Sequence, residues 1–250
     1  MAATSQSSPA IDQTGDRFEP REESEWPLAR TKWTRLQLNF ETATLVPEVK
    51  GSDGEASESF EALGDGLTFI SKPFGQDAEI TGPIAAKLFV SSTTADADLF
   101  LVFRVFAPGM KEVVFQGAID PHTPVAQGWL RASHRKLDPE LSLPYRPYHS
   151  HDERQPLTPG EPVELDIEIW PTCIVVPKGY RIALTVRGRD YEHGSSGGHL
   201  SNFKNELKGC GPFLHDDPVD RPADVFGGTT TLHTSPGKRP ILLLPIIPAG

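Results

Sequence analysis

The sequence is poor in cysteine, with only Cys173 and Cys210 among its 250 residues. Two thiols so far apart do not form the disulfide framework that stabilises small secreted domains. The first residues also lack the positively charged and apolar segments of a secretory signal peptide. We therefore expect two free thiols and a cytoplasmic location.

Long apolar runs and extended basic clusters are missing as well. No apolar stretch approaches the roughly 20 residues that a membrane-spanning helix needs. The formal net charge is -10, and the basic run His134-Arg135-Lys136 is short. Phosphate backbones and anionic lipids are bound by clustered Lys and Arg side chains. The composition therefore disfavours nucleic acids and membranes as partners.

Helical periodicity is almost absent, whereas 24 prolines and 22 glycines interrupt the chain. This punctuation is typical of short strands joined by turns, and about nine strands are predicted. The pattern favours an all-β fold, namely a two-sheet antiparallel jelly-roll sandwich of the galactose-binding-like kind. We expect residues 1–22 to form a disordered arm and residues 23–250 to form one β-domain.

Two segments show the strand patterns most clearly. Thr31–Phe40 alternates in polarity, which indicates a half-buried strand. Leu99–Phe106 is apolar nearly throughout, which predicts a central strand covered on both faces. Residues 48–66 are acidic and rich in Gly and Ser, so we expect a loop there. Further strands are predicted at 67–70, 84–92, 112–119, 163–170, 181–186, 229–234 and 240–247.

One segment matches the G-x-S-x-G pattern of serine hydrolases. Gly194-Ser-Ser-Gly-Gly198 places Ser196 at the nucleophile position, and Asp217 and His233 follow in Ser–Asp–His order. A nucleophile elbow, however, requires a parallel sheet with crossover helices, and the chain shows no such helices. A glycine-rich surface loop is the favoured interpretation, with the triad Ser196, Asp217 and His233 as the alternative.

Histidine- and cysteine-containing loops suggest other chemistry. His149-Ser-His151-Asp152 presents two imidazoles, and His215-Asp-Asp217 adds carboxylates. A catalytic metal needs three convergent ligands, and no motif here fixes that geometry, so polar loops are favoured and neither a metal nor a cofactor is predicted. Cys210 lies near Lys208 and His215, which could activate its thiol, but an unreactive loop cysteine is favoured.

Asp96 and Asp98 precede the central apolar strand and could act as paired acid and base. Aspartates at such positions more commonly cap a turn through hydrogen bonds to the backbone. Arg104, Arg131 and Arg135 are available as counterions. A turn cap with a buried ion pair is the favoured interpretation.

An ordered set of short motifs runs through most of the chain. The tract from Gln127 to about Asp190 contains Gln127-Gly-Trp-Leu-Arg, Leu157-Thr-Pro-Gly-Glu-Pro and Pro171-Thr-Cys-Ile-Val-Val-Pro-Lys-Gly-Tyr. Ile80-Thr-Gly-Pro and Thr94-Ala-Asp-Ala-Asp-Leu-Phe precede it, and Phe226-Gly-Gly-Thr-Thr-Thr-Leu-His follows. In these motifs the chain resembles the C-terminal β-domain of the X-Pro dipeptidyl-peptidase and cocaine-esterase-like (CocE/NonD) serine hydrolases.

The resemblance implies a jelly-roll domain that buttresses an α/β-hydrolase core and helps to wall the substrate cleft. In that family the catalytic Ser, Asp and His lie upstream in the core, so no triad position carries over to this chain. Asp96-Ala-Asp98-Leu stands where the family often has Asp-Thr-Asp-Phe, and Thr172-Cys173 stands where it often has Ser-Asn.

The tryptophans are the candidates for an interface. Trp26 and Trp33 lie in the segment that resembles the stretch following the core in full-length members, and exposed aromatics there would form a partner patch. We expect Trp170, which precedes Pro171 at the end of a predicted strand, to pack in the core.

Three functional hypotheses follow. The leading one is a β-domain without a catalytic triad that acts as a scaffold and binds a hydrolase-core protein or itself through Trp26 and Trp33. The alternative is a small-molecule enzyme with esterase, acyl-transfer or cyclase-like activity in a pocket formed by the loops. A carbohydrate-binding jelly roll is permitted by fold analogy alone.

Overall fold

The structure, a computed structural model, describes residues 21–48, 54–117, 119–194, 206–212 and 214–248. The regular structure in these residues is almost entirely β-strand, with the short helix α1 (Ala223–Phe226) and a 3-10 turn at Ala132–His134. None of the described helices is long and apolar enough to span a bilayer. The strands are β1 (Lys32–Asn39), β2 (Thr44–Pro47), β3 (Ala56–Glu61), β4 (Leu67–Ser71), β5 (Ala78–Ser92), β6 (Asp98–Phe106), β7 (Glu112–Val113), β8 (Ala126–Arg131), β9 (Val163–Val176), β10 (Arg181–Arg187), β11 (Thr229–Thr234) and β12 (Ile241–Ile247).

Strand pairing confirms the all-β, mostly antiparallel fold. The strands form one 12-stranded sheet in the order β3-β11-β5-β12-β1-β2-β4-β10-β6-β7, with β9 added to β5 and β8 added to β6. The pairing does not divide the described strands into two separate sheets, because a parallel contact between β2 and β4 joins the half around β5 to the half around β6. The jelly-roll topology stays a prediction.

Side chains from both halves meet in one apolar core. The inward residues of β1 are Leu36 and Leu38, as the alternation of Thr31–Phe40 predicted. β6 is buried along nearly its whole length, which confirms it as a central strand. The largest fully buried side chains of the core come from β1, β4, β5, β6 and β9 and include Leu38, Phe69, Ile80, Ile84, Leu88, Leu99, Leu101, Phe103, Leu165, Ile167 and Ile169.

Segments with weak local signals were predicted less well. β3 lies within the acidic segment expected to be a loop, where its pairing with β11 provides backbone partners. The strand predicted at 112–119 is reduced to the two residues of β7, and β8 pairs with six residues of β6 instead. β9 continues past Pro171, opposite an irregularity between Gly82 and Ile84 where the register with β5 shifts. A proline is tolerated at such an irregularity because its missing N–H is not needed there.

Gly128 allows β8 to lie directly against β9. A Cβ atom built at Gly128 would stand 2.1 Å from the carbonyl oxygen of Glu168 and 2.9 Å from the Cα atom of Ile169. Both are backbone atoms of a paired strand, so they cannot move aside without disturbing the pairing of β9 with β5. The close approach of the two strands therefore depends on glycine at this position.

We expect Gly128→Ala to lower the free energy of unfolding by about 3 kcal/mol through overpacking, measured by urea denaturation. Gly75→Ala is the matched control, because nothing lies within 4 Å of a Cβ atom there, and its effect should stay below about 0.5 kcal/mol. Equal stability of the two variants would show that β8 and β9 do not need this contact.

Candidate functional site

The structure gives no common geometry for the Ser196, Asp217 and His233 triad. Ser196 lies outside the described residues. Asp217 is exposed in a turn, where its carboxylate accepts a hydrogen bond from Val219 N at 2.8 Å. His233 on β11 shares a 2.8 Å hydrogen bond between its Nε2 and Ser91 Oγ, and burial lowers the pKa of its imidazole. The triad stays a prediction.

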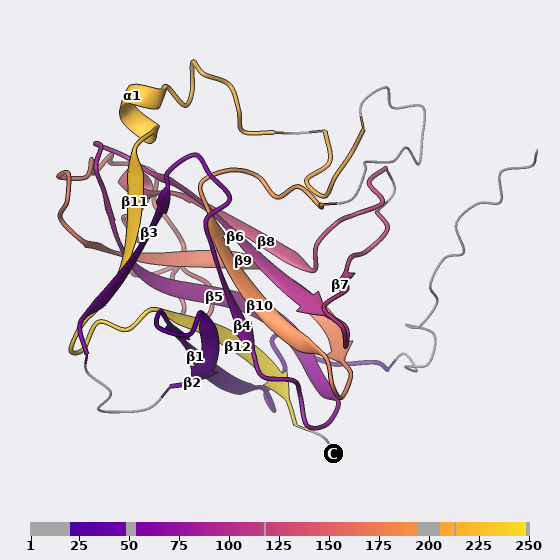
Figure 1. Ribbon diagram of the computed structural model, residues 1–250. Helices are drawn as coiled ribbons and strands as arrows, with labels where there is room; N and C mark the ends of the chain where they lie inside the picture. The colour runs from indigo at the N-terminus through magenta and orange to yellow at the C-terminus, as the bar shows by residue number, and fades with distance from the viewer. Residues whose placement is uncertain (1–20, 49–53, 118, 195–205, 213, 249–250) are drawn as a thin grey trace, which may run out of the picture.

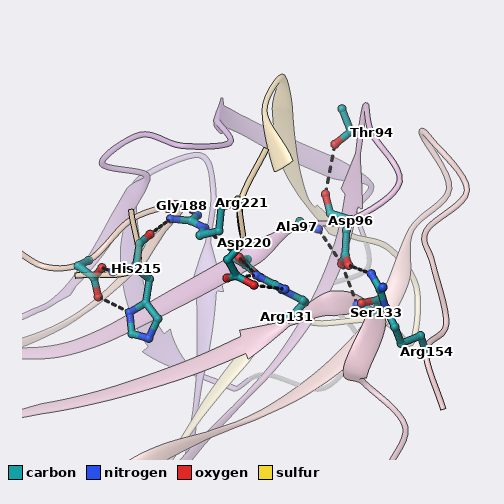
Figure 2. Close-up of polar contacts among 12 residues, drawn as sticks. Thr94, Asp96, Ala97, Arg131, Ser133, Arg154, Gly188, His215, Asp220 and Arg221 are labelled. Carbon is teal, nitrogen blue, oxygen red and sulfur yellow. Dashed lines mark hydrogen bonds and ion pairs between the residues drawn. The ribbon is translucent and has the colours of Figure 1, made fainter. Parts of the chain in front are cut away.

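Asp96 caps the turn before β6, as predicted. Its Oδ1 accepts hydrogen bonds from Ala97 N and Ser133 N, each at 2.9 Å. Arg154 approaches the other carboxylate oxygen at 3.8 Å. Figure 2 shows the Asp96 carboxylate pointing toward Ser133 and Arg154. This carboxylate thus ties the start of β6 to the turn after β8.

Asp98 forms the predicted buried ion pair, but with two arginines. Arg131 Nε and Arg221 Nε each lie 2.8 Å from one of its carboxylate oxygens. The Asp98 and Arg221 side chains are only 9% and 6% exposed. Arg131 was predicted as a partner, whereas Arg221 was missed because 123 residues separate it from Asp98.

The other two candidate counterions have different roles. Arg104 pairs with Glu112 at 2.5 Å, and Arg135 donates to the carbonyl oxygens of Ala132 and Gln155. Neither is paired with Asp96 or Asp98 among the described contacts.

Arg221 fixes the segment before α1 over the outer face of β6. Its guanidinium donates to the carbonyl oxygens of His215 and Gly188, at 2.5 and 2.6 Å, and lies over the ring of Phe100. Figure 2 shows Arg221 with Gly188 and His215, beside the pairing of Arg131 with Asp220. In Figure 1 the segment runs above β6 and β8 before it reaches α1 beside β11. Ion pairs and hydrogen bonds of Arg221 therefore hold the covering segment on β6, together with its contact with the ring of Phe100.

We expect Asp98→Asn to lower the free energy of unfolding by about 3–5 kcal/mol, because Arg221 would remain buried without its counterion. Asp220→Asn is the matched control, since Asp220 binds the same Arg131 at 2.8 Å but is 60% exposed. Exposed pairs contribute roughly 0–1 kcal/mol. Guanidinium denaturation of both variants measures the difference, and a loss below that of Asp220→Asn would contradict the role of the buried pair.

An aromatic groove lies across β8 and β9. Trp170 is 62% exposed, which corrects the expected core packing: in the alternation of β9, Ile169 points inward and Trp170 outward. Trp129 on β8 meets Trp170 edge to face, with ring centroids 5.1 Å apart. The groove has a volume of about 310 Å³ and is lined by Gly128, Trp129, Pro147, Tyr148, His149, His151, Glu168 and Trp170.

The two tryptophans predicted as an interface differ in exposure. Trp26 is 56% exposed. Trp33 is half-buried, because the ring of Tyr145 stacks on it at 4.6 Å between centroids. Trp26 therefore offers more free aromatic surface than Trp33.

The histidine loops bring imidazoles together. His134 Nδ1 and His151 Nδ1 are 3.1 Å apart, and the ring of His149 lies 6.1 Å from that of His151. In the described part of the chain, no three His, Cys, Asp or Glu side chains converge as a metal-ligand set.

The two cysteines are free, as predicted, but their environments differ. Cys173 is exposed on β9. Burial raises the pKa of the Cys210 thiol to about 12, with smaller contributions from Asp190 and Asp120. Cys210 is therefore protonated at neutral pH, although it lies near Lys208 and His215 in the sequence.

We expect iodoacetamide at pH 8 to alkylate Cys173 at least about 100-fold faster than Cys210, because the thiolate is the nucleophile. Peptide mass spectrometry would follow both sites over time, with urea-unfolded protein as the control in which both react. Comparable rates in the folded protein would contradict the protonated state of Cys210.

The family relationship is shown by the chain as a whole. The sequence pattern of the X-Pro dipeptidyl-peptidase C-terminal non-catalytic domain matches residues 3–237. The chain belongs to this family. Two proteins provisionally named serine esterases, from Mycobacterium bovis and Mycobacterium tuberculosis, are each 30% identical to this X-Pro dipeptidyl-peptidase C-terminal domain over 172 residues. The match covers 66% of the chain but only 23% of each relative.

The same fold occurs as part of larger hydrolases whose structures have been solved. A CocE/NonD family hydrolase from Staphylococcus aureus is 26% identical, with a TM-score of 0.76 over 91% of this C-terminal domain and 39% of that chain. An aminopeptidase from a Thaumarchaeota archaeon is 13% identical with a TM-score of 0.59, which shows a shared fold alone. The chain thus spans less than two fifths of these structures.

Proposed function

We propose that this chain acts as a non-catalytic scaffold domain of the CocE/NonD hydrolase lineage, which binds a hydrolase-core protein or a second copy of itself. The observation that carries the proposal is the match of residues 3–237 to a family described as non-catalytic. We further propose the cytoplasm as its location, because both cysteines are free.

The state of the candidate catalytic groups supports a structural role. Asp98 is neutralised by two arginines, and the Cys210 thiol is protonated. A general acid or base must be free to exchange a proton with its substrate. Groups already committed to buried ion pairs stabilise the fold and are poorly suited to that task.

The exposed Trp26 supports docking through the amino-terminal side of the domain. A large aromatic side chain that stays accessible favours burial against a partner. Trp33, half-covered by Tyr145, would border the contact.

We expect affinity capture with the full chain to retain a protein of the α/β-hydrolase fold, and Trp26→Ala to reduce that capture at least about tenfold. Met110→Ala is the control, because Met110 is 53% exposed and lies outside the proposed surface. If the partner is a second copy, sedimentation equilibrium would instead show a dimer that Trp26→Ala dissociates. Undiminished association of the Trp26→Ala variant in both measurements would contradict the proposed surface.

Covalent labelling distinguishes the scaffold proposal from the alternative, a compact esterase or acyl-transfer enzyme. A fluorophosphonate probe reacts with an activated serine. Labelling that Ser196→Ala abolishes, together with turnover of p-nitrophenyl esters, would overturn the scaffold proposal in favour of the triad. An unlabelled wild-type protein would support the scaffold.

A further inference from the structure

The aromatic groove is built by three segments that the fold brings together. Glu168 and Trp170 lie two residues apart on the outward face of β9. Trp129 stands beside them on β8, which Gly128 allows to pack against the β9 backbone. The segment from Pro147 to His151 contributes a further wall of the groove. The groove is thus positioned by the sheet itself and is closed by one loop.

Glu168 lines this groove and has no counterion among the described residues. Its neighbours Glu164 and Asp166 on the same face of β9 both pair with Lys87. No ion pair or hydrogen bond of the Glu168 carboxylate is found among the described residues, and Arg146 acts on it only through space. Partial burial raises the pKa of the Glu168 carboxyl above its usual range. A cation placed beside it would compensate the lost solvation.

Two aromatic side chains that line the groove with Glu168 remain accessible. Trp129 and Trp170 meet at an interplanar angle of 70°, so the edge of one ring is used for the contact. Trp170 and Tyr148 remain 62% and 47% exposed. The negative face of an indole or phenol ring attracts ammonium groups, most strongly the alkylated ones that water solvates poorly.

His149 in this wall does not oppose a positive charge at neutral pH. Burial and the neighbouring His151 lower the pKa of His149, which therefore stays uncharged. Its Nε2 is buried and has no hydrogen-bond partner among the described atoms.

We propose that this groove binds a small organic cation of the alkylammonium class. The cation lies against the faces of Trp170 and Tyr148, and Glu168 supplies the opposite charge. A neutral sugar could stack on the same rings, but it would leave the Glu168 carboxylate without a counterion. The negative net charge of the chain favours a cationic ligand as well. This site does not depend on the proposed docking through Trp26.

Comparing choline with its uncharged isostere 3,3-dimethylbutan-1-ol distinguishes the contribution of ligand charge to binding from that of ligand shape. We expect calorimetric titration of the full chain at pH 7.5 to detect choline with a Kd below about 10 mM and at least about tenfold tighter binding than the isostere. Equal affinities, no choline binding in this range, or binding of glucose in place of choline would overturn the proposal.

Two variants test the assigned residues. Trp170→Ala and Glu168→Gln should each weaken choline binding at least about tenfold, whereas Trp26→Ala and Glu164→Gln, a tryptophan and a glutamate outside the groove lining, should not. Because ionisation of Glu168 is disfavoured in the folded state, Glu168→Gln should keep or raise Tm, so lost binding cannot be ascribed to unfolding. Unchanged affinity in a folded Glu168→Gln variant would overturn the role of the carboxylate.

Discussion

Burial of β6 on both faces is the constraint on which the rest of the structure depends. One face carries Leu99, Leu101 and Phe103 into the core, and the other carries Phe100 and Val102, which must also be shielded from water. The sheet cannot supply that second cover. The segment leading to α1 does so, and the buried pair of Asp98 with Arg221 fixes it in place. A loop without regular structure thereby becomes part of the folded unit.

The same arrangement explains which polar groups are available for function. Carboxylates near β6 form ion pairs with arginines, since a buried unpaired charge there would lower the stability of the fold. Where β8 lies against β9, Trp170 and Tyr148 remain exposed. Glu168 lies in this region, partly desolvated and without a counterion among the residues that the structure describes. The contrast between these two regions separates residues that hold the fold from residues that can meet a ligand.

Local sequence patterns were sufficient to predict the position of a strand wherever that strand had a regular solvent-exposed face or was buried throughout. β6, β10, β11 and β12 lie within a residue or two of their predicted limits, because each is an apolar or alternating run bounded by turns. β3 and β8 were missed, since acidic or mixed sequences become strands only when a distant strand offers hydrogen-bond partners. Asp98 was recognised as half of an ion pair, but its partner Arg221 comes from a loop that no periodicity describes.

The sequence by itself determined the all-β class, the family, the free cysteines and the likeness to a hydrolase β-domain, because these follow from residue order and short-range alternation. Only the tertiary structure decided that Trp170 faces outward beside Trp129, that Tyr145 covers Trp33, and that Glu168 lacks a counterion within the described parts of the chain. Each of these depends on which distant segments lie side by side. The register between paired strands and the path of the covering loops set such contacts, and neither is encoded in a local stretch of residues.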